Sequence, residues 1–192
     1  MTEYSVQLQQ GNRDAKAICT RLSKPSVVMH WLIAFIVIFS IALGYYMTLN
    51  DRYDLYSLHK AIGVLLLPLA AFRIAWRIRK GFPTPCTRME KGKLWVAKGA
   101  HSLLLLCTLV MPISGFISSA AGGYGVPLFG ISLIDAVPQD MRPINQLLAT
   151  TAHTTHIFAG YFITGLLILH IAAAGWHHFV IKDRTLQRML GR

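Results

Sequence analysis

Five of the eight histidines in this chain lie in one apolar stretch, residues 149–183, and side chains of this type at this spacing could do chemistry. They are His153, His156, His170, His177 and His178. Ionisable side chains inside a membrane span are costly and usually mark a functional site that faces the protein interior. His156 and His170 are 14 positions apart, which on a helix leaves about 40° of angular offset and roughly 21 Å along the axis. One helix face thus offers an imidazole to each half of a membrane, which predicts two bound centres.

The composition is that of a membrane protein. Of the 192 residues, 54% are hydrophobic and 14% are charged, and the mean hydropathy is +0.46. Soluble domains of this length rarely look like this. The apolar residues form four runs that each exceed the roughly 20 residues needed to cross a bilayer. We expect a four-helix transmembrane bundle, all-α, with spans at about 27–49, 55–76, 94–121 and 147–180.

The segments between and around these spans are polar or broken. Residues 1–25 and 184–192 are predicted to be tails that flank a membrane domain over residues 26–183. A signal peptide would have a shorter apolar core nearer the N-terminus, so the first run is an uncleaved span, and Pro25 suits its start. Pro68 and Pro112 predict kinks inside the second and third spans. Residues 122–146, rich in Gly and Pro, predict a cap at the interface.

The positive charges set the orientation. Sixteen of the 19 Lys and Arg residues belong to the N-terminal tail, the connection between spans two and three, or the C-terminal tail. Only Arg52, Lys60 and Arg142 belong to the other side. This asymmetry places both termini in the cytoplasm. It also accounts for the net charge of +11 without nucleic acid, because the basic residues flank spans and no stacking aromatic residues interleave with them.

With this topology, the histidines fall into two pairs. His30 and His170 lie in the cytoplasmic half, and His59 and His156 lie in the outer half. Two imidazoles from facing helices fill both axial positions of a low-spin b-type haem, which then only exchanges electrons. Helix bundles commonly hold cofactors between side chains of facing helices. The sequence therefore predicts two haem b groups per chain.

Other interpretations are weaker but stay open. Zinc prefers four clustered ligands, often cysteines, and no cysteine lies near these histidines. A proton or metal transporter lined by imidazoles would usually also recruit buried carboxylates, but the Asp and Glu residues lie outside the spans or at their edges. Structural histidines without a ligand are a further alternative. The three scattered cysteines contain no C-x-x-C-H and indicate no disulfide framework.

Geometry leaves some ligand choices open. His177 lies only about 20° around the helix from His170, and His153 lies one turn from His156, so either could replace a proposed ligand. Five further residues are candidates for supporting the cofactor. Gly63 could admit a flat macrocycle, Arg73 and Arg77 could pair with propionates, Lys60 could serve a propionate or an anionic substrate, and His101 could donate to the haem edge.

Four motifs resemble the prokaryotic cytochrome b-561 family, small four-helix di-haem cytochromes of bacterial inner membranes. The first three are H-W at His30–Trp31, L-H-K-A-I-G at Leu58–Gly63, and A-H with P-I-S-G at Ala100–His101 and Pro112–Gly115. The fourth and most specific is H-x13-H followed by H-H-F-x-x-K-D-x-T-L-x-R-M, from His156 to Met189. Together they cover nearly the whole chain.

The resemblance implies haem b near each membrane face, with His30, His59, His156 and His170 as axial ligands in preference to His177 and His153. It further implies electron transfer with the quinone pool in the bacterial inner membrane. Some family members resemble superoxide oxidases, which pass an electron from superoxide to ubiquinone. Others are haem-bearing membrane anchors that accept electrons from a separate dehydrogenase, so a redox partner protein is an alternative expectation.

Overall fold

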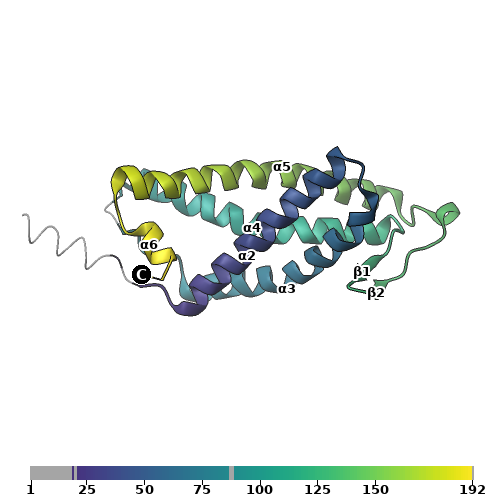
Figure 1. The fold of residues 1–192 in the computed structure, drawn as a ribbon, viewed down its shortest axis with the longest axis horizontal. Coiled ribbons are helices and arrows are strands. Elements are labelled where there is room, and N and C mark those ends of the chain that lie inside the picture. Colours follow the sequence, from purple (N-terminus) through teal and green to yellow (C-terminus); the bar gives the residue numbers. More distant parts are fainter. Residues whose placement is uncertain (1–18, 20, 87–88, 192) are drawn as a thin grey trace, which may run out of the picture.

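The computed structural model describes residues 19, 21–86 and 89–191, and these residues form a bundle of long helices (Figure 1). The long helices are α2 (Lys24–Leu49), α3 (Tyr56–Lys80), α4 (Lys91–Ala121) and α5 (Gln146–Trp176). Each belongs to a segment that is long and apolar enough to cross a membrane. The predicted helical membrane bundle is therefore confirmed.

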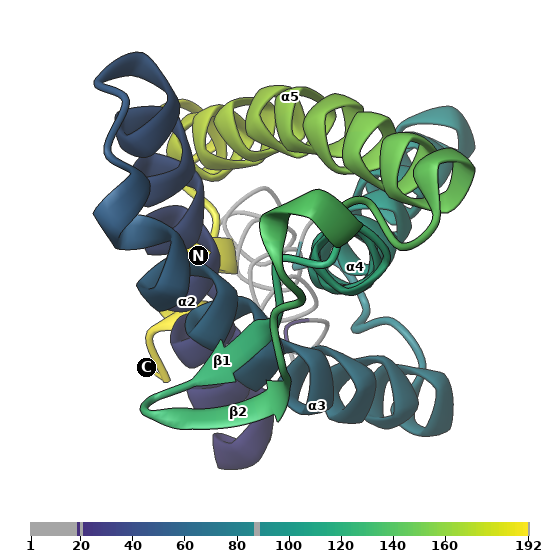
Figure 2. The ribbon, with the colours of Figure 1, turned by 90° about the vertical axis from the view of Figure 1, so that its right-hand side faces the viewer.

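The long helices surround a common centre, as Figure 2 shows in a view from the end of the bundle. Along the chain each packs on the next, α2 on α3, α3 on α4 and α4 on α5. The first and last of these helices are joined by a hydrogen bond of 3.3 Å, which Tyr45 of α2 donates to Thr164 of α5. A small apolar core fills the middle, consisting of Ile33, Val37, Leu66, Cys107 and Ile163.

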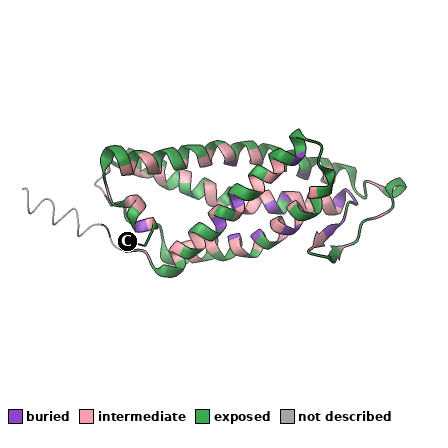
Figure 3. Ribbon diagram, in the orientation of Figure 1, coloured by how far each residue is buried: buried purple, intermediate pink, exposed green. Residues whose placement is uncertain are grey.

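The outer surface of the bundle is largely apolar. Figure 3 shows that most residues on the outside of the helices are exposed. They include Phe35, Phe158 and Leu169, whose exposed fractions are 71%, 70% and 67%. A soluble monomer rarely exposes such large apolar patches, whereas in a bilayer these side chains contact lipid. Because every backbone group of a helix is satisfied internally, this surface suits the hydrocarbon region.

The helix bounds differ modestly from the expected spans. Helix α2 begins at Lys24, with Pro25 in its first turn as expected. Helix α3 runs to Lys80 and α4 begins at Lys91, so both extend into basic segments that hydropathy alone assigns to the connection. Long basic side chains can reach the headgroup region while their backbone stays helical. The helices continue through Pro68 and Pro112.

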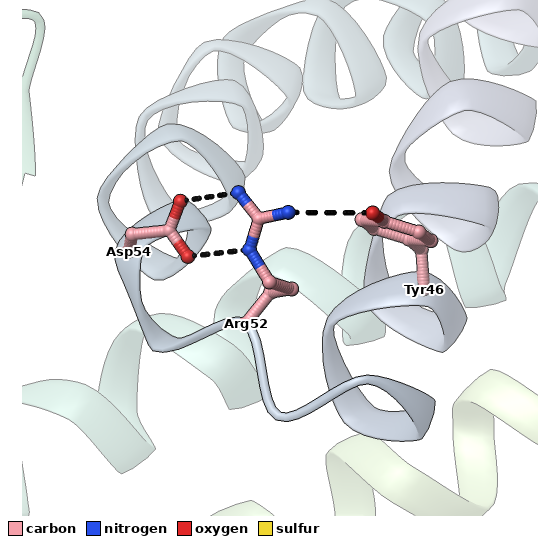
Figure 4. Close-up of polar contacts among 3 residues, drawn as sticks. All are labelled: Tyr46, Arg52 and Asp54. Carbon is pink, nitrogen blue, oxygen red and sulfur yellow. Dashed lines mark hydrogen bonds and ion pairs between the residues drawn. The ribbon is translucent and has the colours of Figure 1, made fainter.

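The connection between α2 and α3 is a tight polar turn. It contains the short 3-10 helix η1 (Tyr53–Leu55). Arg52 donates to both carboxylate oxygens of Asp54, at 2.9 and 2.8 Å, and to the hydroxyl of Tyr46 at 3.4 Å (Figure 4). The hydrogen bond to Asp54 raises the pKa of Arg52 above its usual value. The positive charge of Arg52 is thus already matched within the turn.

At one end, which we call the cap end, residues 122–145 fold over the bundle. Two short antiparallel strands, β1 (Val126–Leu128) and β2 (Ile131–Ile134), precede the 3-10 helix η2 (Gln139–Met141). Strand β1 packs on α3, and Val126 is almost fully buried. Gly125 has a φ of +69°, and a Cβ there would lie 2.8 Å from the backbone nitrogen of Ala136. The expected cap is thus a hairpin, an element that the all-α prediction omits.

At the other end, which we call the basic end, the chain folds back under the bundle. Helix α5 continues into a π-helical turn, η3 (His177–Ile181), followed by the short helix α6 (Thr185–Met189). Trp31 of α2 donates to the carbonyl of Met189 at 2.7 Å, and Arg188 donates to the carbonyl of Thr84 at 2.8 Å. The predicted C-terminal tail is therefore a docked helix.

A disulfide also lies at the basic end, where the cysteine spacing indicates none. It joins Cys19 to Cys86, 67 positions apart. The expectation of no disulfide is wrong for this pair, because Cys19 and Cys86 are far apart in sequence and come together only in the folded chain. Cys107 is free and buried. Except for residue 19 and residues 21–25, the predicted N-terminal tail lies outside the described residues.

Candidate functional site

The four histidines proposed as ligands meet in two pairs, one toward each end of the bundle. His30 of α2 faces His170 of α5, with ring centres 6.4 Å apart and ring planes at 66°. His59 of α3 faces His156 of α5, with ring centres 6.1 Å apart and planes at 89°. All four histidines are partly buried. The 14-residue spacing on α5 thus places one imidazole toward each end, as the sequence predicts.

These separations fit an ion held between two imidazoles. Two metal–nitrogen bonds of about 2.0 Å each, plus about 1 Å from each nitrogen to its ring centre, place the ring centres about 6 Å apart. Both pairs meet this distance. In the described part of the chain no three His, Cys, Asp or Glu side chains gather as a metal cluster, which does not favour zinc. Two axial imidazoles are what a six-coordinate haem iron requires.

The cap-end pair borders a cavity between the helices with a largely apolar lining. Residues from all four helices line it: Val37, Ser40, Ile41, His59, Gly63, Leu66, Thr108, Met111, Pro112, His156 and Ile163. Two buried polar atoms in this lining, Oγ of Ser40 and Nδ1 of His59, have no hydrogen-bond partner. A Cβ on Gly63 would meet nothing within 4 Å. Unpaired buried polar atoms call for a partner, and these residues fit a haem.

Two glycines lie against the cap-end rings, and at one of them, Gly115, the ring is too close to leave room for a side chain. A Cβ on Gly44 would lie 3.4 Å from Cε1 of His59, in ordinary contact. A Cβ on Gly115 would lie 3.0 Å from Cε1 and 3.1 Å from Nδ1 of His156, closer than nearly all real contacts. In the sequence, Gly115 is only the last residue of the P-I-S-G motif at Pro112–Gly115, and Gly44 belongs to none of the motifs.

His156 has a defined backbone partner. Its Nδ1 lies 2.8 Å from the carbonyl oxygen of Met111 in α4 and 3.3 Å from the hydroxyl oxygen of Ser114. Because a carbonyl can only accept, Nδ1 carries the proton, and Nε2 is left with a free lone pair. Such a hydrogen bond to the second ring nitrogen is typical of histidines that bind metals. Sequence reasoning missed this contact.

The basic-end pair lies among further polar side chains. Arg73 donates to Nδ1 of His30 at 2.8 Å. The ring of His101 lies 5.2 Å from that of His170, edge to face, and Nδ1 of His101 lies 2.6 Å from the carbonyl of Ala97. The separation of His101 from His170 is shorter than that of either facing pair. His101 therefore lies beside this pair.

Three candidate residues have partners away from the rings. Arg77 donates to the carbonyl of Gly81 at 3.0 Å and so caps α3. Lys60 donates to the cap carbonyls of Gly125, at 3.1 Å, and Tyr124, at 3.4 Å. His177 pairs with Asp183 at 2.6 Å. His153 is exposed.

The electrostatics of the tail depend on Asp183. Burial raises the pKa of this carboxyl group, but hydrogen bonds from His177 and Thr185 outweigh burial and hold the pKa below its usual value. Burial also lowers the pKa of Arg188, partly offset by Asp183. In the sequence the two residues belong to the C-terminal motif from His177 to Met189, which does not show their contacts.

The fold defines a multi-pass helical membrane protein, with one facing histidine pair toward each end of the bundle. The chain belongs to the prokaryotic cytochrome b561 family, whose sequence model matches residues 21–192. It is 33% identical over 172 residues to cytochrome b561 homolog 2 of Escherichia coli K12, covering 87% of this chain and 89% of that protein. It is 29% identical over 170 residues to probable superoxide oxidase CybB of Yersinia pestis, covering 84% and 91%. It is 28% identical over 178 residues to cytochrome b562 of Cereibacter sphaeroides, covering 85% and 91%.

Family membership defines the general activity. The protein is a membrane electron-transfer protein of the bacterial inner membrane, and its family implies haem b as the cofactor. The apolar helical bundle agrees with this location.

Proposed function

We propose that each facing histidine pair holds one haem b and that the protein carries electrons between the two faces of the membrane. His30 and His170 would bind iron at the basic end, and His59 and His156 at the cap end. The observation that supports this proposal is the spacing of the facing rings, 6.4 and 6.1 Å, in two separate pairs. Haem b, when bound, supplies one-electron redox chemistry at its iron.

The side chains around the pairs have separate roles. The two histidines of each pair would hold the haem iron and leave it electron exchange alone as chemistry. Gly63 leaves open space beside the cap-end pair. Arg73 and His101, beside the basic-end pair, are placed to meet propionates or the haem edge. Burial among the helices restricts water, which together with nearby charge sets the reduction potential.

The test is a reduced-minus-oxidised absorbance spectrum of detergent-purified protein, with pyridine haemochrome quantitation per chain. Two b-type haems per chain support the proposal. One haem means that one histidine pair is misassigned, and none in protein made with ample haem overturns it. The transporter interpretation would then come first.

We propose quinone as the redox partner within the membrane. The helices that carry the four histidines expose their outer faces to lipid, so a lipid-soluble carrier can reach the bundle without leaving the bilayer. Reduction of the purified protein by ubiquinol, followed at the haem absorbance bands, tests this proposal. No change in absorbance with excess ubiquinol would contradict it.

A second candidate, superoxide oxidation, is favoured by the similarity to the relative named probable superoxide oxidase CybB. An anionic substrate needs a steering positive charge. At the cap end, Arg52 is paired with Asp54, and Lys60 and Arg142 bond to carbonyls of the cap. The pairing of Arg52 with the Asp54 carboxylate leaves less net positive charge at this end, which favours an electron donor other than superoxide. Superoxide consumption coupled to ubiquinone reduction by haem-loaded protein, absent in a His156→Ala variant, would support the second candidate.

A further inference from the structure

The bridge between Cys19 and Cys86 lies on the side of the membrane where lasting disulfides are rare. Cys19 precedes α2 and Cys86 follows α3, so both belong to the basic end. The positive-inside rule places this end in the cytoplasm. Thioredoxin and glutathione keep thiols reduced there, and the disulfides that do form are mostly transient or redox-sensing. The location therefore favours a bridge that opens and closes over one that only staples the fold.

The two sulfurs of the bridge differ in how well a reductant can reach them. Cys86 is 6% exposed, whereas Cys19 is only partly buried. Thiol–disulfide exchange begins when a thiolate attacks one sulfur and the other leaves, so the attack falls on Cys19 and Cys86 departs. Cys107 lies in the apolar core between the long helices and stays out of the exchange.

Contacts of the neighbouring residues connect the bridge to the docked C-terminal helix. Residues 81–86 form no helix or strand, so their position depends on tertiary contacts. One of these is the hydrogen bond that Arg188 of α6 donates to the carbonyl of Thr84. Arg188 is buried, and the residue after it, Met189, accepts a hydrogen bond from Trp31 of α2. Opening the bridge removes the covalent restraint on residues 81–86 and so loosens the surface on which α6 docks.

We propose that the Cys19–Cys86 pair is a thiol–disulfide exchange site for cytoplasmic dithiol reductants, and that its oxidation state controls the docking of α6. A thiolate of the reductant attacks Sγ of Cys19, the bond between the two cysteines breaks, and Cys86 leaves and takes a proton. The second thiol of the reductant then closes its own disulfide and releases Cys19 as a thiol. Two electrons and two protons thus pass from the dithiol to the protein, and a disulfide oxidant reverses the step. No step requires a bound haem.

The first test applies reduced thioredoxin, a dithiol reductant, to the full chain in detergent. Maleimide labelling should show that the folded protein loses its bridge within minutes, and Cys107 should stay unlabelled as the report that the fold persists. A thioredoxin that keeps only its attacking cysteine should be trapped as a mixed disulfide on Cys19. A bridge that opens only after unfolding, or a mixed disulfide on Cys86, would overturn the proposal.

The second test follows the two cysteines in growing cells. Rapid acid quenching, followed by maleimide labelling and peptide mass spectrometry, reports the thiol and bridged forms. We expect the thiol form to predominate during growth and the bridged form to predominate within minutes of adding diamide, a thiol oxidant. A bridge that persists in untreated cells, or thiols that survive diamide, would overturn the proposal.

The third test measures the docking of α6 by amide hydrogen exchange of the oxidised and the reduced protein. The amides of Thr185–Met189 should exchange at least about tenfold faster after reduction, because a helix held by fewer contacts opens more often, whereas those in the middle of α5 should not change. Arg188→Gln should give fast exchange in both states. Arg184→Gln, at an exposed position of the same tail, is the matched control and should behave like wild type. Equal exchange of α6 in oxidised and reduced wild-type protein would refute the control of docking.

Discussion

Gly115 of α4 lies directly against the imidazole of His156 on α5, and a methyl group at this glycine would be 3.0 Å from the ring. The ring cannot retreat freely, because its Nδ1 is bonded to the Met111 carbonyl. The close packing of α4 on α5 at this level therefore depends on the absence of a side chain.

Gly115→Ala should consequently destabilise the protein and weaken haem retention at the cap end. Overpacking of a tight interior typically costs about 1–3 kcal/mol. Thermal unfolding in detergent and haem content per chain measure the two effects.

The matched control is Gly99→Ala on the same helix, where a Cβ would meet nothing within 4 Å. This change should be neutral or stabilise the helix by up to about 1 kcal/mol. Equal effects of the two substitutions would refute the role given to Gly115.

Substitution of the paired histidines should remove one haem at a time. His59→Ala and His156→Ala should each lose the cap-end haem, and His30→Ala and His170→Ala should each lose the basic-end haem. Pyridine haemochrome quantitation should then give about half the wild-type haem. The reason is that each haem would be held by two histidines, and each substitution would remove one of them.

His177→Ala is the control, because its ring pairs with Asp183 in the structure. It should keep both haems. If it emptied a site while His170→Ala did not, the ligand set proposed for the basic end would be wrong.

Apolar runs and charge asymmetry were sufficient to predict the four helices and the histidine pairing. A span of more than 20 apolar residues leaves few structural alternatives, and the spacing of His156 and His170 fixes their shared face. The hairpin of the cap was not predicted, because strands of three and four residues are too short to show a period-two pattern.

The contacts that support the site could not be predicted for a different reason. The partner of His156 is a main-chain carbonyl, and residue type does not show which carbonyl a neighbouring helix will present. The pairing of His177 with Asp183 requires a π-helical turn followed by Lys182 with a φ of +57°. The disulfide joins residues 67 positions apart, a contact that only the folded chain creates.

The disulfide predicts a specific pattern of thiol reactivity. In oxidised, folded protein, a maleimide should label none of Cys19, Cys86 and Cys107, because two are bridged and the third is buried. After mild reduction it should label Cys19 and Cys86. Peptide mass spectrometry identifies the labelled residues.

Loss of the bridge should also lower stability. In the chain-entropy model, closing a loop of this length restricts the unfolded chain by about 4 kcal/mol. Cys86→Ser should therefore lower the unfolding temperature. Cys107→Ser is the control for the labelling experiment, because it should leave the labelling of Cys19 and Cys86 unchanged. Labelling of Cys86 before reduction would contradict the bridge.

The carboxylate of Asp183 should stabilise the docked C-terminal tail in a defined pH range. Its side chain is nearly fully buried, accepts from His177 at 2.6 Å and from the backbone nitrogen of Thr185 at 2.8 Å, and has a lowered pKa. A lowered folded-state pKa contributes stability above the unfolded-state value of about 3.9 and loses it as the pH falls through the folded-state value.

Asp183→Asn should therefore cost about 1–3 kcal/mol, as for a buried hydrogen-bonding group left partly unsatisfied, and the cost should be largest where the carboxyl group is ionised. The difference in unfolding temperature between wild type and variant should be fully present at pH 6 and shrink below about pH 4. Asp140→Asn, in the exposed part of the cap, is the control. A difference that grew on acidification would show that the ionised form of Asp183 does not hold the tail, because protonation would then strengthen the contact instead of removing it.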